Sequence, residues 1–281
     1  MKPLIGFVGQ GWIGNNYAND FERRGYTVIR YDITPKYVQN KERIKDCKII
    51  FIAVPTPSTK EGFDDSILIS AINATTEGQI VVIKSTIQVG TTDKLQELFP
   101  DRFILHSPEF LTEKTAKFDV ANPDRNIVGY TNNSKKVAGK VMVVLPQAPY
   151  EEIIPCKEAE LVKYAGNVWF YTKVMIINLI YDVAKKNGLD YEIIKEALGA
   201  DKRVGRTHLD AEHQGGRGAG GHCFIKDMSA FREMYIKSAG IMKSESHELQ
   251  AIKFLSAIED LNKKLLKKSG KSIDLLRGVY E

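Results

Sequence analysis

The chain of 281 residues has an ordinary globular composition, 43% hydrophobic and 27% charged, and is long enough for one large domain or two smaller ones. Its net charge of +5 is mild and its basic residues are scattered, which argues against a nucleic-acid partner and suits anionic small ligands such as nucleotides. Three cysteines are too few for a disulfide framework and favour a reducing, cytoplasmic compartment. No stretch has the pattern of a signal peptide or of a membrane span, so we expect no membrane partner.

A glycine motif follows the first predicted strand, residues 3–8. Gly9, Gly11 and Gly14 come directly before a predicted helix over residues 15–24. In this context the first glycine makes a tight turn, the second lets a pyrophosphate lie against bare backbone, and the third packs the helix on the strand. The helix N-terminus then favours the phosphate. The motif predicts a dinucleotide site, and the alternative is an α/β turn that binds nothing.

Asp32 strengthens the dinucleotide interpretation. It ends the second predicted strand, residues 26–31, at the distance from the glycines where a carboxylate accepts from both ribose hydroxyls. An acid at this position repels the 2′-phosphate of NADP, so we expect NAD.

Strands and helices then alternate up to about residue 150. We expect strands over 47–54, 79–84 and 103–106, with helices over 66–76 and 91–98, and the segments 127–129 and 140–145 complete the domain. This alternation predicts a doubly wound parallel sheet of the Rossmann type. Thr56, Thr86 and Glu109 follow three of its strands, where ligands of such sheets bind. Singly each residue reads as a cap or turn, and together they indicate a site.

From Pro155 the pattern becomes helical, with one long helix to about Lys186 that ends at Asn187 and Gly188. Its length and apolar character predict that it joins two domains and forms a homodimer contact. The fold class is therefore α/β, with an NAD-binding domain over residues 1–150 and an all-α central domain over 151–281. Lys163 and Asn167 lie four apart on the long helix, where they stabilise an oxyanion or merely form a solvated face.

The glycine-rich stretch 215–227 carries the third cysteine, Cys223, just ahead of a predicted helix that runs to about Ser238. The helix N-terminus and Lys226 would lower the pKa of a thiol there, as a nucleophile requires. The alternative is a surface turn with an inert, buried cysteine.

Across about its first 235 residues, the chain resembles the UDP-glucose/GDP-mannose dehydrogenases. The matching motifs, in the family's order, are GFVGQGWIG with Asp32, FIAVPTP, KSTIQVGTT, SPEFLTEKTAKFD, ELVKYAGN, GADKRVG and GGRGAGGHCFIKD. The resemblance implies two successive NAD-linked oxidations that turn the C6 alcohol of a nucleotide sugar, UDP-glucose foremost, into a carboxylate.

The resemblance also implies the site residues. Cys223 is similar to the nucleophile that forms a thiohemiacetal and then a thioester, Lys163 to the oxyanion-stabilising group with Asn167 beside it, and Glu109 to the acid/base of thioester hydrolysis. Asp227 and Thr86 match groups that orient water or move a proton. The implied NAD-binding residues are Gly9, Gly11, Trp12, Ile13, Gly14, Asp32, Val54, Pro55, Thr56, Thr86 and Glu113. The implied substrate-binding residues are Glu109, Phe110, Leu111, Lys163, Asn167, Arg203, Gly218, Gly220 and Gly221, and no metal is implied.

The chain departs from the family at three places. Ile225 stands where the family has a proline, and Leu179 where a glutamate commonly follows the asparagine. Family members are also usually longer, with a third domain that closes over the nucleotide base, and we expect this chain, which stops at Glu281, to lack it.

Two other functions stay open. A two-electron β-hydroxyacid dehydrogenase would also place a lysine and an asparagine four apart on a helix, but it lacks the cysteine loop. A relative that binds NAD and nucleotide sugar without turnover would have no chemical need for Cys223, Lys163, Asp227 and Glu109 together. A Cys223→Ser variant separates these possibilities, because only the four-electron enzyme should stall.

Overall fold

The computed structural model describes residues 2–59, 62–112, 114–213, 215–240 and 246–271. The chain divides into two compact units, Met1–Lys163 and Tyr164–Glu281. Among the described residues, no helix combines the length and the apolar character needed to cross a bilayer.

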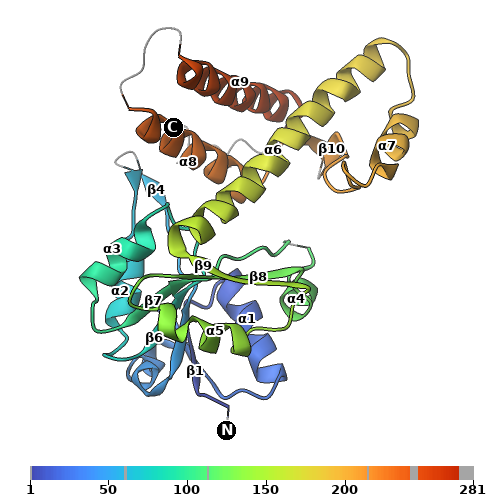
Figure 1. Cartoon of the computed structure of the whole chain (residues 1–281). Helices are drawn as coiled ribbons and strands as arrows, with labels where there is room; N and C mark the ends of the chain where they lie inside the picture. The colour runs from blue at the N-terminus through green and yellow to red at the C-terminus, as the bar shows by residue number, and fades with distance from the viewer. Residues whose placement is uncertain (1, 60–61, 113, 214, 241–245, 272–281) are drawn as a thin grey trace. The chain divides into compact units, whose positions relative to one another are not determined.

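The first unit is built on a seven-stranded sheet in the order β2-β1-β3-β6-β7-β8-β9 (Figure 1). The strands are β1 (Ile5–Val8), β2 (Val28–Tyr31), β3 (Ile49–Ile52), β6 (Ile80–Ile83), β7 (Phe103–His106), β8 (Arg125–Tyr130) and β9 (Tyr150–Pro155). The strands β2, β1, β3, β6 and β7 are parallel, whereas β8 is antiparallel to β7 and parallel to β9. The doubly wound class is confirmed. The sheet is mostly rather than wholly parallel. After β7 the chain does not return to the amino-terminal edge of the sheet before it enters β8, so β8 runs in the opposite direction.

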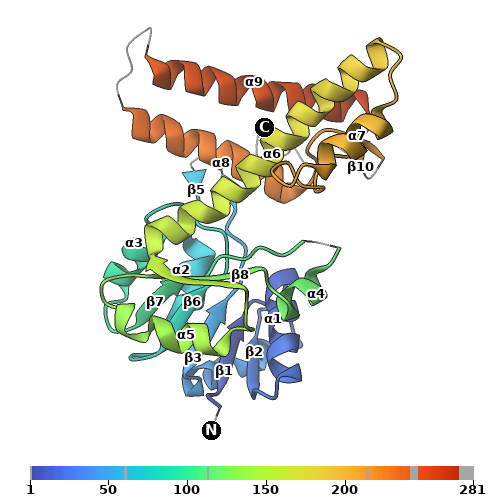
Figure 2. The ribbon, with the colours of Figure 1, turned by 45° about the vertical axis from the view of Figure 1, so that its right-hand side comes forward.

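Helices cover both faces of this sheet (Figure 2). One face packs against α1 (Trp12–Arg23), α4 (Ala116–Ala121) and α5 (Ala138–Val144), and the other against α2 (Ser66–Asn73) and α3 (Thr91–Leu98). All four residues of β1, β3 and β6 are buried, as expected of strands covered on both sides. The shorter elements of this unit are η1 (Val38–Asn40), η2 (Glu42–Asp46), β4 (Ser58–Thr59), β5 (Gly62–Phe63) and η3 (Lys135–Val137).

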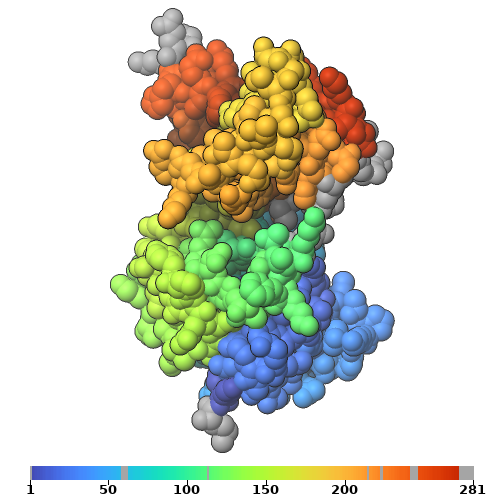
Figure 3. Space-filling view, turned by 90° about the vertical axis from the view of Figure 1, so that its right-hand side faces the viewer, coloured from blue at the N-terminus to red at the C-terminus, as the bar shows by residue number. Residues whose placement is uncertain are grey.

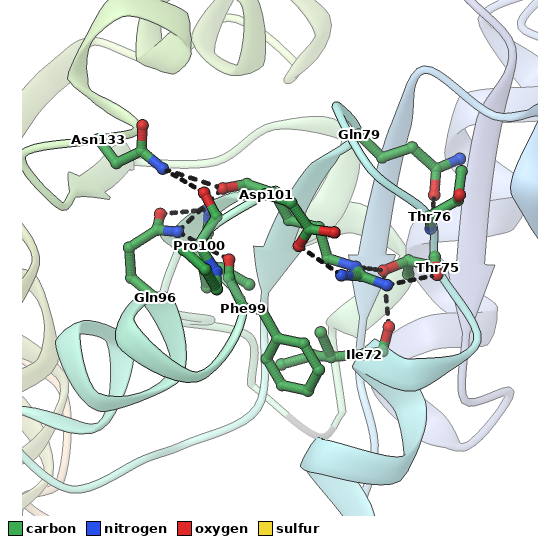
Figure 4. A network of polar contacts seen from close by, with 11 residues as sticks. Ile72, Thr75, Thr76, Gln79, Gln96, Phe99, Pro100, Asp101 and Asn133 are labelled. Atoms are coloured by element: carbon green, nitrogen blue, oxygen red, sulfur yellow. Dashed lines mark hydrogen bonds and ion pairs between the residues drawn. The ribbon is translucent and has the colours of Figure 1, made fainter.

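Side-chain amides and one guanidinium satisfy backbone groups where the chain enters β6 and β7 (Figure 4). Arg102 donates to Oγ1 and the carbonyl oxygen of Thr75 at 2.9 and 2.8 Å, and Gln79 donates to the carbonyl oxygen of Cys47 at 2.7 Å. Gln96 donates to the carbonyl oxygen of Phe99 at 3.0 Å, and Asn133 to that of Pro100 at 3.1 Å. Internal hydrogen bonds therefore fix the chain at the amino-terminal ends of β6 and β7.

The second unit is helical. It contains the larger part of α6 (Cys156–Lys186), then α7 (Tyr191–Ala200), the hairpin of β10 (Glu212–His213) and β11 (Gly216–Arg217), α8 (His222–Ala239) and α9 (His247–Lys268). The helices α8 and α9 lie side by side (Figures 1 and 2), and their apolar residues form a core with α6. A smaller core joins α6 to α7 and the loop after it, whose gold and orange surface Figure 3 shows.

The first unit extends beyond the boundary expected at residue 150, because residues 151–163 belong to it. The strand β9, which the sequence analysis did not predict, pairs with β8, and its residues are mostly exposed without a clear apolar alternation. The first turns of α6 are tied to the start of α3 by Glu160, whose carboxylate accepts from the amides of Gly90 and Thr92 at 2.5 and 2.8 Å. Burial raises the pKa of Glu160 despite these hydrogen bonds.

Candidate functional site

The glycine motif forms the turn between β1 and α1. A Cβ on Gly9, which has φ of +88°, would collide with the carbonyl oxygen of Ala53, and a Cβ on Gly14 would collide with that of Gly9. A Cβ on Gly11 would meet nothing within 4 Å. Two glycines are thus required by the fold itself, and Gly11 is the one whose missing side chain leaves open space. Gly11 is the N-cap of α1 and makes no side-chain cap hydrogen bond, so the amides of the first turn are available to a ligand, as a phosphate site requires.

Asp32 lies directly after β2 and is hydrogen-bonded to the same turn. Its Oδ2 accepts from the amide of Gln10 at 2.6 Å, and its Oδ1 accepts from the amide of Thr34 at 2.9 Å. Burial raises the pKa of Asp32, but these backbone hydrogen bonds outweigh it, so the pKa lies below its usual value. The carboxylate is therefore charged and fixed beside the glycine turn.

The ends of β3 and β6 are linked next to this turn. Ser85 accepts from the amide of Val54 at 3.0 Å and donates to its carbonyl oxygen at 2.7 Å. The hydroxyl of Thr56 donates to the carbonyl oxygen of Thr86 at 2.7 Å. Because β3 and β6 are neighbours in the sheet, Val54, Thr56 and Thr86 lie together at its carboxyl edge, as the sequence analysis expected of strand ends.

The other residues predicted to bind NAD are placed as follows. Trp12 is 43% exposed at the start of α1, while Ile13 packs against the core. Pro55 is exposed between Val54 and Thr56. Glu113 lies outside the described residues.

A buried ion pair lies in the first unit between Glu109, in the loop after β7, and Lys163, on α6. Nζ of Lys163 is 3.6 Å from Oε2 of Glu109, and their side chains are only 9% and 7% exposed. The amide of Leu111 donates to the other carboxylate oxygen of Glu109. Two predicted catalytic residues thus come together, and the pair can hold or move a proton away from bulk water.

Phe110 and Leu111, predicted to bind substrate, are partly used by the unit itself. The Arg125 guanidinium lies 3.9 Å from the centroid of the Phe110 ring, and Leu111 packs against the core. Their role in binding stays a prediction.

Lys84 is a buried charged residue beside this pair to which the sequence analysis gave no role. Its Nζ donates to Oγ of Ser107 and the carbonyl oxygen of Pro108 at 3.3 and 3.4 Å and lies 4.3 Å from the ring centroid of Tyr17. Burial lowers the pKa of Lys84 to about 7, partly offset by Glu109 and reinforced by Lys163. The signal in the sequence was a lysine that directly follows the apolar strand β6.

His106 and Tyr17 complete these surroundings. Burial, with a smaller contribution from Lys84, lowers the pKa of His106 to about 3, and burial raises the pKa of Tyr17. Both side chains are therefore neutral at ordinary pH.

In the second unit, Asn167 on α6 donates a hydrogen bond from its amide to Oδ2 of Asp227 on α8. Asp227 is 2% exposed. This contact joins two more of the predicted catalytic residues and accounts for an asparagine in the interior of a long helix.

The helix α8 begins at His222, so Cys223 belongs to its first turn rather than to the loop before it. The glycine pair Gly220 and Gly221 indicated a loop that continues through the cysteine, but the loop ends at Gly221, the N-cap with φ of +120°. The side chain of Cys223 lies outside the described residues, so its role stays a prediction.

Gly218 and Gly220 are crowded by the unit itself. A Cβ on Gly218 would lie 2.7 Å from Oδ1 of Asn262, and one on Gly220 would lie 3.3 Å from Nζ of Lys271. A Cβ on Gly221 would meet nothing within 4 Å. Packing against Asn262 of α9 therefore explains Gly218, whereas Gly220 meets only the end of a flexible lysine side chain, so the predicted role of Gly220 in ligand binding stays a prediction.

Arg203 is 90% exposed and pairs with Asp201 at 2.6 Å. Its predicted contact with substrate stays a prediction.

The sheet, the glycine turn and Asp32 define an NAD-binding α/β protein. Comparison with known families identifies the two parts: residues 37–145 match the NAD binding domain of the UDP-glucose/GDP-mannose dehydrogenase family, and residues 157–264 match its central domain. The chain belongs to the UDP-glucose/GDP-mannose dehydrogenase family.

Individual relatives agree with this membership. An uncharacterized protein of Methanocaldococcus jannaschii is 34% identical over 96% of this chain and 34% of its own length. The UDP-glucose 6-dehydrogenase of Pseudomonas aeruginosa is 32% identical over 77% of this chain and 50% of its own length. The solved structure of a UDP-glucose dehydrogenase from Pyrobaculum islandicum is similar with a TM-score of 0.77 at 27% identity, covering 93% of this chain and 68% of that one. The chain thus spans a third to a half of the length of these two curated relatives.

Proposed function

We propose that the protein oxidises the C6 alcohol of a nucleotide sugar, UDP-glucose foremost, to the carboxylate in two NAD-linked steps. The observation that carries the proposal is the buried Glu109–Lys163 pair at the carboxyl edge of an NAD-binding sheet, in a chain that also has Cys223 in the first turn of a helix. The names of the relatives support the choice of UDP-glucose.

NAD, when bound, supplies the hydride acceptor for each oxidation. The open space at Gly11 and the charged carboxylate of Asp32 fit its pyrophosphate and ribose, and Asp32 disfavours a 2′-phosphate. The same preference for NAD was expected from the sequence.

The chain's own residues supply the covalent chemistry. Loss of a hydride and a proton from the C6 alcohol gives the aldehyde. The Cys223 thiolate adds to this aldehyde to give a thiohemiacetal, whose loss of a second hydride leaves a thioester. Water then attacks the thioester carbon, the C–S bond breaks, and the thiol is regenerated with the carboxylate. Alcohol and water together yield the carboxylate, two hydrides and three protons.

The polar groups stabilise the charges that arise. Lys163 and Asn167 stabilise the oxyanion at C6. Glu109 takes a proton from the attacking water and gives it to the sulfur of Cys223 as the C–S bond breaks. Asp227 fixes the amide of Asn167 and, with Thr86, orients water. Lys163 lies 3.6 Å from Glu109 and can pair with it before the substrate's own charge develops.

We also propose that the protein is a homodimer that contacts its copy through α6. Trp169, Ile176 and Val183 recur at seven-residue spacing, so they share a face of the helix, and they are 67%, 48% and 60% exposed. The free, buried thiols of Cys47 and Cys156 fit the cytoplasmic compartment that we infer.

The experiment is NADH formation by the wild-type chain with a panel of UDP-sugars, GDP-mannose and a small β-hydroxy acid. Turnover with a nucleotide sugar that Cys223→Ser abolishes before the acid is released is the expected result. Turnover confined to the β-hydroxy acid, or turnover of the sugar that Cys223→Ser leaves unchanged, would contradict the proposal.

A further inference from the structure

Asn262, on α9, is fully buried and faces the loop that precedes α8. Its Oδ1 accepts from the amide of Ala219 at 2.8 Å, and its Nδ2 donates to the carbonyl oxygen of Ala219 at 3.1 Å. One side chain thus satisfies both polar groups of one residue, which is otherwise buried away from water. Such paired hydrogen bonds fix both the position and the orientation of the backbone that they hold.

The same loop is held from its other side by α6. The guanidinium of Arg217 donates to Oδ1 and to the carbonyl oxygen of Asn178 at 2.9 and 3.0 Å, and to Asp182 at 2.7 Å. The loop between Arg217 and α8 is therefore anchored to two helices, and Asn262 makes the anchor nearer to α8.

Two features of the loop show that its position is tightly defined. Gly218 has φ of +88° and leaves room for Asn262, since an added Cβ would lie 2.7 Å from its Oδ1. Nζ of Lys271 donates to the carbonyl oxygen of Gly218 at 3.2 Å. Only residues 220–222 lie between Ala219, which Asn262 binds through both of its backbone polar groups, and Cys223, and the last of these three residues is already helical.

We propose that Asn262 is a positioning residue for the nucleophile: its clasp on Ala219 fixes the start of α8 and thereby the place of Cys223. This inference rests on the proposed function of Cys223. It explains why a carboxamide is buried in the apolar core between α8 and α9, where an unpaired polar group would be costly.

The test disrupts the hydrogen bonds between Asn262 and Ala219, which we call the clasp, once by a substitution on α9 and once by a substitution in the loop. Asn262→Leu removes both hydrogen bonds at similar volume, and Gly218→Ala retains Asn262 but forces it away from the loop. The controls are Asn126→Leu, which removes a buried amide of β8 that bonds to Pro146, and Gly188→Ala, which puts the same strain on a glycine with φ of +67° and open space around it.

Two readouts separate positioning from stability. The first is the pH at which alkylation of Cys223 reaches half its maximal rate, followed by peptide mass spectrometry with the buried Cys47 and Cys156 as internal standards. The second is kcat with saturating nucleotide sugar, together with the Kd of NAD. Both clasp variants should move the alkylation midpoint to higher pH, because the start of α8 is no longer fixed, and lower kcat by about 10- to 100-fold with an unchanged Kd of NAD.

The controls should lower Tm and leave both readouts as in the wild type. An unchanged midpoint and kcat in folded Gly218→Ala or Asn262→Leu would overturn the inference, and so would equal effects in the controls. Should the wild-type chain turn over no nucleotide sugar, the proposed function fails by itself, and the alkylation midpoint still decides whether Asn262 positions Cys223.

Discussion

Lys84 places an amino group in the interior of the first unit, where its hydrogen bonds to described residues go to neutral acceptors, the hydroxyl of Ser107 and the carbonyl oxygen of Pro108. The charged or titratable side chains around it are Tyr17 of α1, His106 of β7, Glu109 and Lys163. Burial holds its pKa at about 7, against 10.5 for a free lysine. Between these two pH values the unfolded chain binds more protons than the folded chain, so the contribution of Lys84 to the free energy of unfolding rises with pH in this window.

We therefore expect Lys84→Met to flatten the pH dependence of the free energy of unfolding between about pH 7 and pH 10. The measurement is urea unfolding at a series of pH values. Lys140→Met, at an exposed lysine of α5, serves as control and should keep the wild-type slope. A slope that Lys84→Met leaves unchanged would show that Lys84 remains charged in the folded protein throughout this range.

The turn between β1 and α1 shows how one element distributes its glycines between folding and binding. A side chain at position 14 would collide with the backbone carbonyl oxygen of Gly9, whereas a Cβ at position 11 would meet nothing within 4 Å. We expect Gly14→Ala to lower the free energy of unfolding by about 1–3 kcal/mol or more, as overpacking does.

Gly11→Ala should fold normally and bind NAD about tenfold more weakly or worse, because a methyl group would occupy the place of the pyrophosphate.

Thermal unfolding and calorimetric titration with NAD measure these two effects. Gly139→Ala, at an exposed glycine of α5 with open space around it, is the control for both. Normal NAD affinity in Gly11→Ala would place the pyrophosphate elsewhere.

Among helices and strands, the sequence predicts the elements whose residue pattern is local. The strands β1, β3, β6 and β7 and the helix α3 follow from apolar runs and turn residues. The strand β9 is missed because it is an edge strand with little burial to impose a pattern, and the start of α8 is missed because Gly220 and Gly221 indicate a loop. The direction of β8 depends on where the chain re-enters the sheet, which no local pattern encodes.

The candidate site is predicted in the same uneven way. Glu109, Asp32 and the glycine turn are found because they follow strands or match a motif. Lys84 and Asn262 are not, since their importance comes from burial and from contacts with residues far away in the sequence.

For the molecule as a whole, the exposed apolar face of α6 predicts self-association. We expect the wild-type chain to be a dimer in light scattering after size exclusion, and the Trp169→Glu, Val183→Glu double variant to be a monomer, because charges would be buried against apolar groups. Val143→Glu, at an exposed valine of α5, should leave the dimer intact. A wild-type monomer at micromolar concentration would contradict the assignment of this face.

In the proposed function, Cys223 retains the aldehyde and carries it through a second oxidation. The most direct measurement is the amount of NADH formed per UDP-glucose consumed when the sugar is limiting and NAD is in excess. We expect about two NADH per sugar, with UDP-glucuronate as the product, and no net formation of NADH in Cys223→Ala. One NADH per sugar, with free aldehyde released, would contradict it and assign the chain to two-electron chemistry.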